Sequence, residues 1–352
     1  MRQFKLAAAL LATAFLASCG GNSKPHFTSL VSFGDSLSDV GTYAVGTVAQ
    51  LGGGKYTING PDGKNWIELM APKFGLSAPC AAETGLDGDP AQGFSVPVTN
   101  FPNCTAYAQG GARVTDPVGP GNKLLGGANA VLGQLTVPVV TQIQTHLARK
   151  GGSFGGSEIV FVFAGGNDVF MQLATLNATI AAGGDPNAAS TAAVTAMGTA
   201  GAELAGYIKT QIIGKGAKYV TVINLPDVSK TPFALAESAQ TQGLINTMVT
   251  TFNTQLSQGL SGLDVLYVDA YTSSRDENAN PTKYGFTNVI SPACDLSPQK
   301  NPLGSSLVCT RNNLIAGAVD NYEFADSVHP TPFGYRVLAD LVTSELVKKG
   351  WL

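Results

Sequence analysis

The sequence predicts a single α/β domain in which a parallel β-sheet lies between two layers of helices. Apolar runs typical of strands alternate along the chain with segments whose apolar residues recur at helical spacing, and this alternation is typical of βαβ units. Residues 158–163 and 218–225 are almost continuously apolar, as strands buried on both faces are. No internal repeat is present, so we expect one domain although the length of 352 residues would allow two.

Each expected element rests on a local pattern. Short apolar runs predict strands at residues 27–33, 105–109, 158–163, 218–225 and 264–269. Apolar residues that recur every three or four positions, or an alanine-rich composition, predict helices at residues 65–74, 137–150, 188–213, 240–260 and 332–349. Trp66 and Met70 show the helical spacing in the first of these, and Pro332 suits the first turn of the last.

Three stretches rich in Gly, Pro, Asn and Asp resist assignment, at residues 52–63, 78–103 and 273–326. Loops of this length in a compact domain are usually functional walls or lids. Surface decoration pinned by disulfides is an equally open interpretation.

The composition limits the class of partner. Charged residues make up 13% of the chain, about half of the roughly 25% usual in soluble domains. The formal net charge is −3 and no basic stripe is present, which argues against nucleic acid as a partner. The apolar share of 44% is sufficient for a large core.

The N-terminus has the pattern of a processing signal. Arg2 and Lys5 precede an apolar run, residues 6–16, that is too short to span a bilayer comfortably. The run ends in Leu16-Ala17-Ser18-Cys19-Gly20, which resembles a bacterial lipobox. We therefore expect residues 1–18 to be a signal peptide, residues 19–26 an acylated Cys19 with its tether, and residues 27–352 the folded domain. The mature chain would then be exported and lipid-anchored in the cell envelope, at the outer membrane. An ordinary secretory signal is the alternative.

Four further cysteines remain, Cys80, Cys104, Cys294 and Cys309. An even number in an oxidising compartment favours disulfides. Three pairings are possible, and proximity in the sequence favours Cys80–Cys104 with Cys294–Cys309. A zinc site is the rival, but neither CxxC spacing nor a nearby histidine supports it.

Small and polar residues follow three of the expected strands. In open α/β sheets, ligands bind outside the carboxyl ends of the strands. The residues at these ends are Gly34-Asp35-Ser36-Leu37-Ser38-Asp39, Gly110-Gly111 and Gly165-Gly166-Asn167-Asp168.

Ser36 is the candidate nucleophile, because it follows a strand on a tight turn. Its base should be a histidine with an orienting acid. His329 has Asp326 three residues before it, and Pro330 favours an extended conformation at His329. Of the other two histidines, His146 lies in a helical pattern and is expected at the surface, and His26 is expected in the tether.

An attack on an acyl carbon creates an oxyanion that needs preorganised donors. The candidates are the backbone N–H groups of Ser36 and Gly111 and the side-chain amide of Asn167. Each of these short sequence stretches, called blocks below, also has a purely structural interpretation: Asp35 could cap the turn at Ser36, and Asn167 could cap a helix.

Taken together and in this order, the blocks resemble the GDSL esterases and lipases, also called SGNH hydrolases. The similar stretches are Phe33-Gly34-Asp35-Ser36-Leu37-Ser38-Asp39, Ala106-Tyr107-Ala108-Gln109-Gly110-Gly111-Ala112-Arg113, Gly165-Gly166-Asn167-Asp168 and Asp326-Ser327-Val328-His329-Pro330. The resemblance covers about residues 28–346.

The resemblance implies a flavodoxin-like three-layer α/β/α fold and ester hydrolysis through an acyl-serine. It implies Ser36 as nucleophile, His329 as base and Asp326 as its orienter, with an oxyanion hole of Ser36, Gly111 and Asn167. It asks for no cofactor or metal. The chain departs from the family pattern at Ala106, where an Asn is usual, and Gly110 is a neighbouring alternative to Gly111.

Other functions remain open at this point. Within the family, the substrate could be a simple ester, a lipid or phospholipid, a choline ester or an acetylated sugar, and the acyl group could pass to an alcohol in place of water. A catalytically idle surface-binding lipoprotein and a serine peptidase are rivals from other classes. We expect a monomer. No P-loop, HExxH motif or GxGxxG after a strand is present, and no GxSxG sequence follows a strand to form a nucleophile elbow. Nucleotide-binding, zinc-protease and α/β-hydrolase interpretations therefore lack support.

Overall fold

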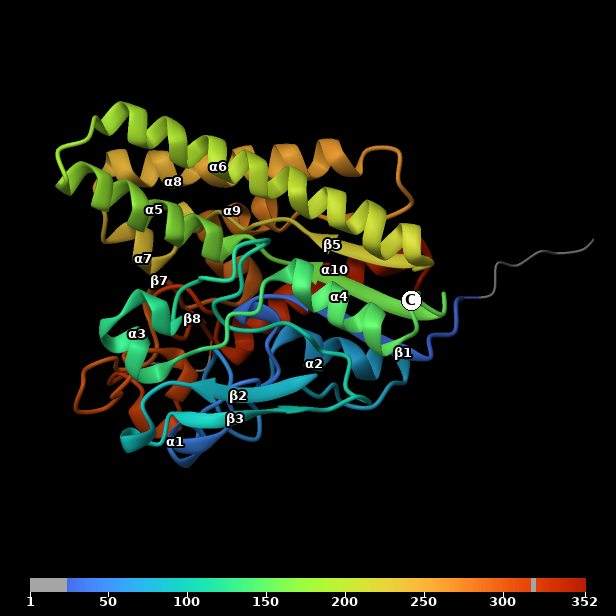
Figure 1. Ribbon diagram of the computed structural model, residues 1–352, viewed down its shortest axis with the longest axis horizontal. Coiled ribbons are helices and arrows are strands. Elements are labelled where there is room, and N and C mark those ends of the chain that lie inside the picture. Colours follow the sequence, from blue (N-terminus) through green and yellow to red (C-terminus); the bar gives the residue numbers. More distant parts are fainter. Residues whose placement is uncertain (1–23, 318–320) are drawn as a thin grey trace, which may run out of the picture.

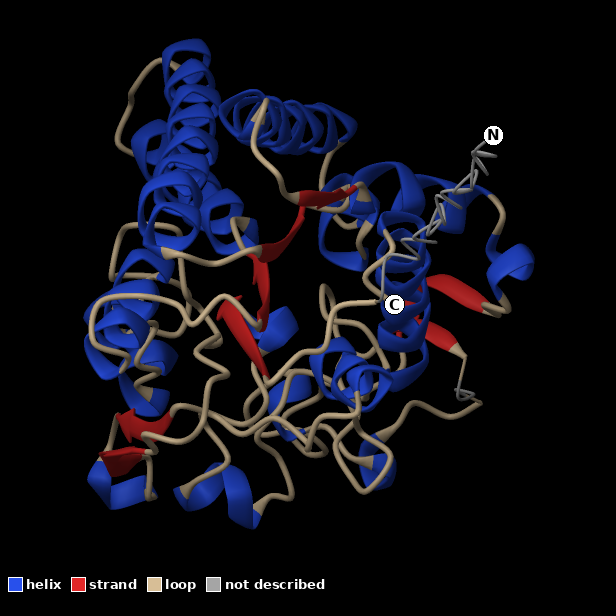
Figure 2. Ribbon diagram, turned by 90° about the vertical axis from the view of Figure 1, so that its right-hand side faces the viewer, coloured by secondary structure: helices blue, strands red, loops and turns tan. Residues whose placement is uncertain are grey.

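A four-stranded parallel sheet forms the centre of the protein, as predicted (Figure 1). The computed structural model describes residues 24–317 and 321–352. The strands lie in the order β1 (Ser29–Gly34), β4 (Glu158–Phe163), β5 (Tyr219–Ile223) and β6 (Leu266–Val268). All neighbouring pairs are parallel. Figure 2 shows these strands between helices on both sides.

The two faces of the sheet carry different helices because side chains alternate along each strand. Val160 and Val162 pack with one group of helices, and Ile159, Phe161 and Phe163 pack with the other. The first group is α4 (Val139–Arg149), α5 (Gly166–Ala181), α6 (Pro186–Tyr207) and α8 (Ala239–Leu260). The second is α2 (Trp66–Met70) and α10 (Pro332–Lys349). The predicted three-layer α/β arrangement is therefore confirmed.

Two predicted elements need correction. Residues 105–109 form only isolated bridges, Ala106 with Ser32 and Ala106 with Ala81. The segment still lies along β1, because Ser32 N–H donates to the Thr105 carbonyl at 3.1 Å. Its other edge is also occupied, since Ala82 N–H donates to the Ala106 carbonyl at 2.7 Å. The second correction is α5, a helix of 16 residues that the sequence patterns did not indicate.

Two of the three unassigned stretches contain regular structure. Residues 78–103 include an antiparallel pair, β2 (Glu83–Asp87) and β3 (Ser95–Asn100). Residues 273–326 include most of α9 and a parallel pair, β7 with β8. Their bounds are α9 (Ala270–Ala279), β7 (Asn288–Pro292) and β8 (Tyr322–Phe324). The remaining short helices are α1 (Gly46–Gln50), α3 (Gly127–Leu132) and α7 (Pro232–Leu235).

The favoured cysteine pairing is confirmed. Disulfides join Cys80 to Cys104 and Cys294 to Cys309. The expected signal peptide and Cys19 lie outside the described residues. Among the helices of residues 24–317 and 321–352, none is long and apolar enough to cross a membrane.

Candidate active site

The end of β1 is held by a buried amide. Gly34 N–H donates to Gln142 Oε1 at 2.9 Å, and Gln142 Nε2 donates to the Gly34 carbonyl at 2.8 Å. A Cβ at Gly34 would lie 2.1 Å from the Phe163 carbonyl oxygen of the paired strand, so only glycine fits here. The chain then turns at Asp35, whose side chain accepts from Leu37 N–H and caps a 3₁₀ turn, Ser36–Ser38. Ser36 is thereby placed at the carboxyl end of the central sheet.

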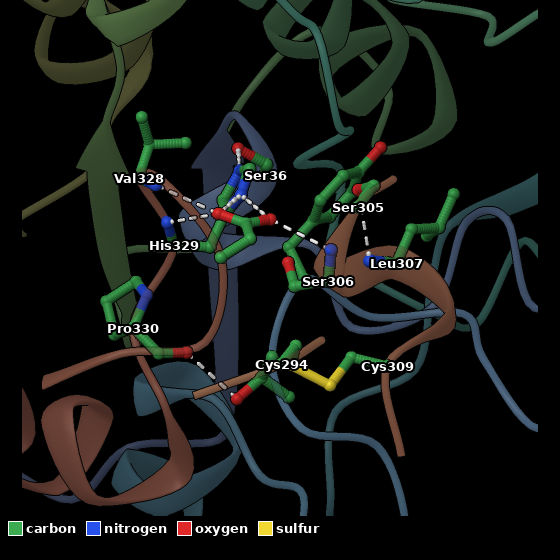
Figure 3. A network of polar contacts seen from close by, with 12 residues as sticks. Ser36, Cys294, Ser305, Ser306, Leu307, Cys309, Val328, His329 and Pro330 are labelled. Atoms are coloured by element: carbon green, nitrogen blue, oxygen red, sulfur yellow. Dashed lines mark hydrogen bonds and ion pairs between the residues drawn. A yellow bond between two sulfur atoms is a disulfide. The ribbon is translucent and has the colours of Figure 1, made fainter. Parts of the chain in front are cut away.

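Ser36, His329 and Asp326 form one hydrogen-bonded chain. Ser36 Oγ lies 2.9 Å from His329 Nε2, and His329 Nδ1 lies 2.8 Å from Asp326 Oδ2 and 2.9 Å from Oδ1. Figure 3 shows His329 beside Ser36. The histidine lies on a loop between β8 and α10, as the adjacent Pro330 suggested, and Ala325 N–H donates to its carbonyl at 2.7 Å. The structure thus brings together all three residues that the sequence singled out for nucleophilic chemistry.

The Asp326 carboxylate is buried and has several hydrogen-bond donors. Val328 N–H and His329 N–H donate to Oδ1 at 2.9 and 2.8 Å, and Ser306 N–H donates to Oδ2 at 2.9 Å. Burial opposes ionisation, but the neighbouring His329 and these hydrogen bonds hold the pKa of Asp326 below its usual range. The carboxylate is therefore charged at neutral pH and suited to stabilise an imidazolium.

Asn167 lies in the same pocket as Ser36 and His329. It is the second residue of α5, and its Nδ2 donates to the Ala112 carbonyl at 2.8 Å. The helix is preceded by Gly165 with no side-chain cap, so the interpretation of Asn167 as a helix cap is wrong. The hydrogen bond to Ala112 also joins the Asn167 block to the one that contains Gly111.

The Gly111 block is held by buried carboxylates on either side. Asp39 Oδ2 accepts from Gly110 N–H at 2.9 Å. Asp168 accepts from Arg113 Nε at 3.0 Å and from Val114 N–H at 3.1 Å. Gly111 itself is not among the residues that line the pocket around Ser36. With Ala106 in place of the family's usual Asn, these two carboxylates fix the block instead.

Two adjoining pockets surround the site. The first contains Ser36, Asn167 and His329, and its apolar walls include Phe170 and Leu225. Its empty volume is about 440 Å³, a figure that includes the solvent-filled mouth of the pocket. The second, of about 740 Å³ counted in the same way, shares Leu37, Pro226, Thr231 and Val328 with the first. Its walls are mainly apolar, apart from polar residues such as Glu277 and Glu323. Among the described residues, no group of three or more His, Cys, Asp or Glu side chains is placed to hold a metal ion.

The other histidines do not contribute to the site. His146 is 1% exposed, and its ring stacks on Phe154 with 4.5 Å between centroids, so the expected surface position is wrong. Burial lowers the pKa of His146 to about 4, which keeps it neutral. His26 is exposed, just before β1.

Gln142 and Ser306 were not identified from the sequence. Gln142 carried a signal, because it is a polar residue on the same helical face as the apolar Val139 and Ile143. Ser306 acts through its backbone N–H, which every residue except proline has, so the sequence carried no signal for it.

Burial makes Asp35 a pH-sensitive group. Desolvation raises the pKa of Asp35 from 3.8 to about 7. Between these values the folded protein holds a proton that the unfolded chain has lost, so stability falls as pH rises through this window. Asp35→Asn keeps the side-chain oxygen that accepts from Leu37 N–H but cannot bind or release the proton. We predict that the free energy of unfolding falls less between about pH 5 and about pH 8 in this variant than in the wild type. Urea denaturation at both pH values measures it.

Asp62→Asn, on an exposed loop, controls for the removal of one negative charge. It should leave the wild-type pH dependence unchanged. An Asp35→Asn protein with the same pH dependence as wild type would show that Asp35 is ionised in the folded state across this range.

Comparison with known proteins identifies the family of this chain. The profile of the GDSL-like lipase/acylhydrolase family matches residues 30–342. Two GDSL esterases/lipases of Arabidopsis thaliana are 31% and 30% identical over 101 and 112 residues, which are 27% and 30% of this chain and 23% and 31% of those proteins. The match thus spans about a quarter to a third of the length of these curated relatives. An extracellular lipase from Streptomyces rimosus aligns over 90% of this chain and 99% of its own, with a TM-score of 0.45 and 15% identity. Since the family profile covers most of the sequence, this chain belongs to the GDSL-like lipase/acylhydrolase family.

Proposed function

We propose that this protein hydrolyses carboxylic esters through an acyl-serine intermediate, with Ser36 as nucleophile, His329 as base and Asp326 as the orienting acid. The observation that carries the proposal is the hydrogen-bonded chain from Ser36 Oγ through the imidazole to the Asp326 carboxylate. The family is one of lipases and acylhydrolases, which are hydrolases that act on ester bonds.

The chemistry follows from the positions of the protons. As Ser36 Oγ attacks the acyl carbon, His329 Nε2 takes the hydroxyl proton, and the ionised Asp326 stabilises the resulting imidazolium. The imidazolium then gives this proton to the departing alkoxide, leaving the acyl group on Ser36. Water repeats the sequence: His329 takes its proton, the hydroxide oxygen attacks the acyl carbon, and Ser36 Oγ leaves with the proton returned.

We propose that Ser36 N–H, Gly111 N–H and Asn167 Nδ2 stabilise the oxyanion. One Nδ2 hydrogen of Asn167 is used by the Ala112 carbonyl, which fixes the amide and leaves the other hydrogen for the pocket. The Gly110 N–H is used by Asp39, so Gly111 is the better donor from this block.

The walls of the two adjoining pockets support an ester with an apolar acyl or alkyl arm. The residues shared by both pockets, Leu37 and Val328 among them, flank the reacting groups in sequence. An arm that leaves the first pocket would therefore enter a second apolar space. Rates that fall steadily as the acyl chain of a p-nitrophenyl ester lengthens would argue against this.

We propose further that the chain is exported as a lipoprotein of the bacterial cell envelope, with residues 1–18 removed, Cys19 acylated and held at the outer membrane, and residues 27–352 forming the hydrolase domain. The lipobox-like residues 16–20 support this, and two disulfides are typical of proteins in an oxidising compartment.

Ser36→Ala and His329→Ala are each expected to lower kcat for p-nitrophenyl esters by at least about a thousandfold, because both groups act directly on the reacting bonds. Steady-state hydrolysis measures this, with circular dichroism to show that each variant is folded. His26→Ala is the matched histidine control and should keep wild-type kcat, because His26 is exposed and outside the site. Full activity in Ser36→Ala would disprove the assignment of the nucleophile.

Asn167→Ala is expected to lower kcat by about 10²–10³-fold, the usual loss for one oxyanion donor. KM should change little, because the donor acts mainly on charge that develops in the transition state. Measuring kcat and KM separately tests this, and a variant that raises KM while keeping kcat would assign Asn167 to substrate binding instead.

Cys19→Ser is expected to abolish incorporation of radiolabelled palmitate and to release the protein from the membrane fraction of its cells. The esterase activity of the released protein should be preserved, since residues 16–20 are outside the folded domain as we define it. Palmitate labelling that persists in Cys19→Ser would contradict the lipoprotein assignment.

A further inference from the structure

We propose that the Cys294–Cys309 disulfide is a positioning device for the catalytic acid. It joins the segment that is hydrogen-bonded to the backbone just before Asp326 to the turn whose N–H binds the Asp326 carboxylate. This inference rests on the proposed function, in which Asp326 orients His329.

One half of the disulfide is fixed to the strand that precedes Asp326. Cys294 N–H donates to the Ala325 carbonyl at 2.9 Å, and Ala293 N–H donates to the Phe324 carbonyl at 2.9 Å. Because Ala325 is the residue directly before Asp326, the position of Cys294 is coupled to the position of the acid.

The other half ends the turn that supplies the hydrogen bond. A 3₁₀ turn spans Ser306–Val308, and Cys309 N–H donates back to the Ser306 carbonyl at 3.0 Å. Ser306 N–H, at the start of the turn, donates to Asp326 Oδ2 at 2.9 Å. Figure 3 shows the disulfide below the turn that carries Ser306. The disulfide thus connects the turn that contains the donor to Cys294, which is hydrogen-bonded to the residue before the acceptor.

The two carboxylate oxygens depend on different parts of the chain. Oδ1 accepts from Val328 and His329, which belong to the same short loop as Asp326. Oδ2 accepts a backbone hydrogen bond only from Ser306 among the described residues, 20 positions away. Displacement of the turn would leave Oδ2 with His329 Nδ1 as its remaining partner, while Oδ1 keeps its two backbone donors. The carboxylate would then no longer be held from the side of Oδ2, and its orientation toward His329 Nδ1 would change.

The disulfide lies in a small apolar cluster, against which Leu296, Leu314 and Tyr322 also pack. The buried cluster around it is small and consists of Ile58, Ala293, Cys294, Cys309 and Ala325. Cys309 is the residue through which the turn joins this cluster, whereas Leu307 and Val308 of the turn pack in a separate buried cluster. The connecting residues are mostly polar or small, and they form short turns and no long helix.

Asn59 supports the same turn from the irregular stretch at residues 52–63. Its Nδ2 lies 3.0 Å from both the Ser306 and the Cys309 carbonyls, and its N–H donates to the Cys309 carbonyl at 2.7 Å. Asn59 is buried, so these bonds are shielded from water. It provides a second way to disturb the turn without changing a cysteine.

The Cys80–Cys104 disulfide is a matched control. Its neighbours are Ala106, whose N–H donates to the Cys80 carbonyl, and Phe101, whose carbonyl accepts from Cys104 N–H. Neither cysteine makes a hydrogen bond to the loop that contains Asp326 and His329 in the described structure. Replacing Cys80 and Cys104 therefore removes a disulfide and leaves the surroundings of Asp326 unchanged.

The test compares the full-length oxidised protein with Cys294→Ser/Cys309→Ser and Cys80→Ser/Cys104→Ser, using p-nitrophenyl ester hydrolysis. We expect kcat to fall at least tenfold in the first variant with KM within twofold of wild type, and to stay within twofold in the second. The rate of fluorophosphonate labelling of Ser36 should fall in parallel in the first variant. A general loss of stability would lower the thermal midpoint of unfolding without slowing the labelling of the folded fraction.

Wild-type kcat in a folded Cys294→Ser/Cys309→Ser protein would overturn the inference and leave the proposed function intact. An inactive wild-type protein would instead overturn the proposed function. If the double serine variant does not fold, Asn59→Ala decides: a lower kcat at unchanged KM supports positioning of the acid through the turn, and an unchanged kcat refutes it.

Discussion

The geometry of the site depends on the double hydrogen bond between the Gln142 side chain and the backbone of Gly34. The side-chain amide of Gln142 donates to the Gly34 carbonyl and accepts from the Gly34 N–H, and so holds the last residue of β1 from the side. Because the paired strand leaves no space for a Cβ at Gly34, the position of the turn is fixed by two independent contacts. Ser36 follows two residues later, and every other group in the site is placed relative to it.

Buried carboxylates then hold the loops around this serine to one another. Asp39 binds Gly110, Asp168 binds Arg113 and Val114, and Asp326 binds Ser306. Burial raises the pKa of Asp39 to about 6 and also raises the pKa of Asp168, whereas the pKa of Asp326 is lowered by its histidine and its donors. The loops of the site are therefore joined to one another by hydrogen bonds to buried carboxylates, mostly from backbone N–H groups.

Local patterns predicted much of this arrangement. Strand Glu158–Phe163 and helix Pro332–Lys349 have the predicted bounds, because continuous apolar composition and a proline at the first turn are local properties. The β2–β3 pair and α5 were missed because their stability comes from tertiary contacts that composition does not reveal. His146 was misjudged although Val139 and Ile143 precede it at helical spacing on the buried face. The three residues that we propose for the triad were found from their order and strand positions, but a backbone donor such as Ser306 has no signature in the sequence.

The distance along the chain between Ser36 and His329 has a consequence for biosynthesis. The two residues are 293 positions apart and form one hydrogen bond, and contacts of such separation form late because the intervening chain must first be ordered. During synthesis or translocation from the N-terminus, a nascent chain carries its serine long before it carries a base. In the mechanism that we propose, Ser36 therefore gains its base only once nearly the whole chain is present and folded.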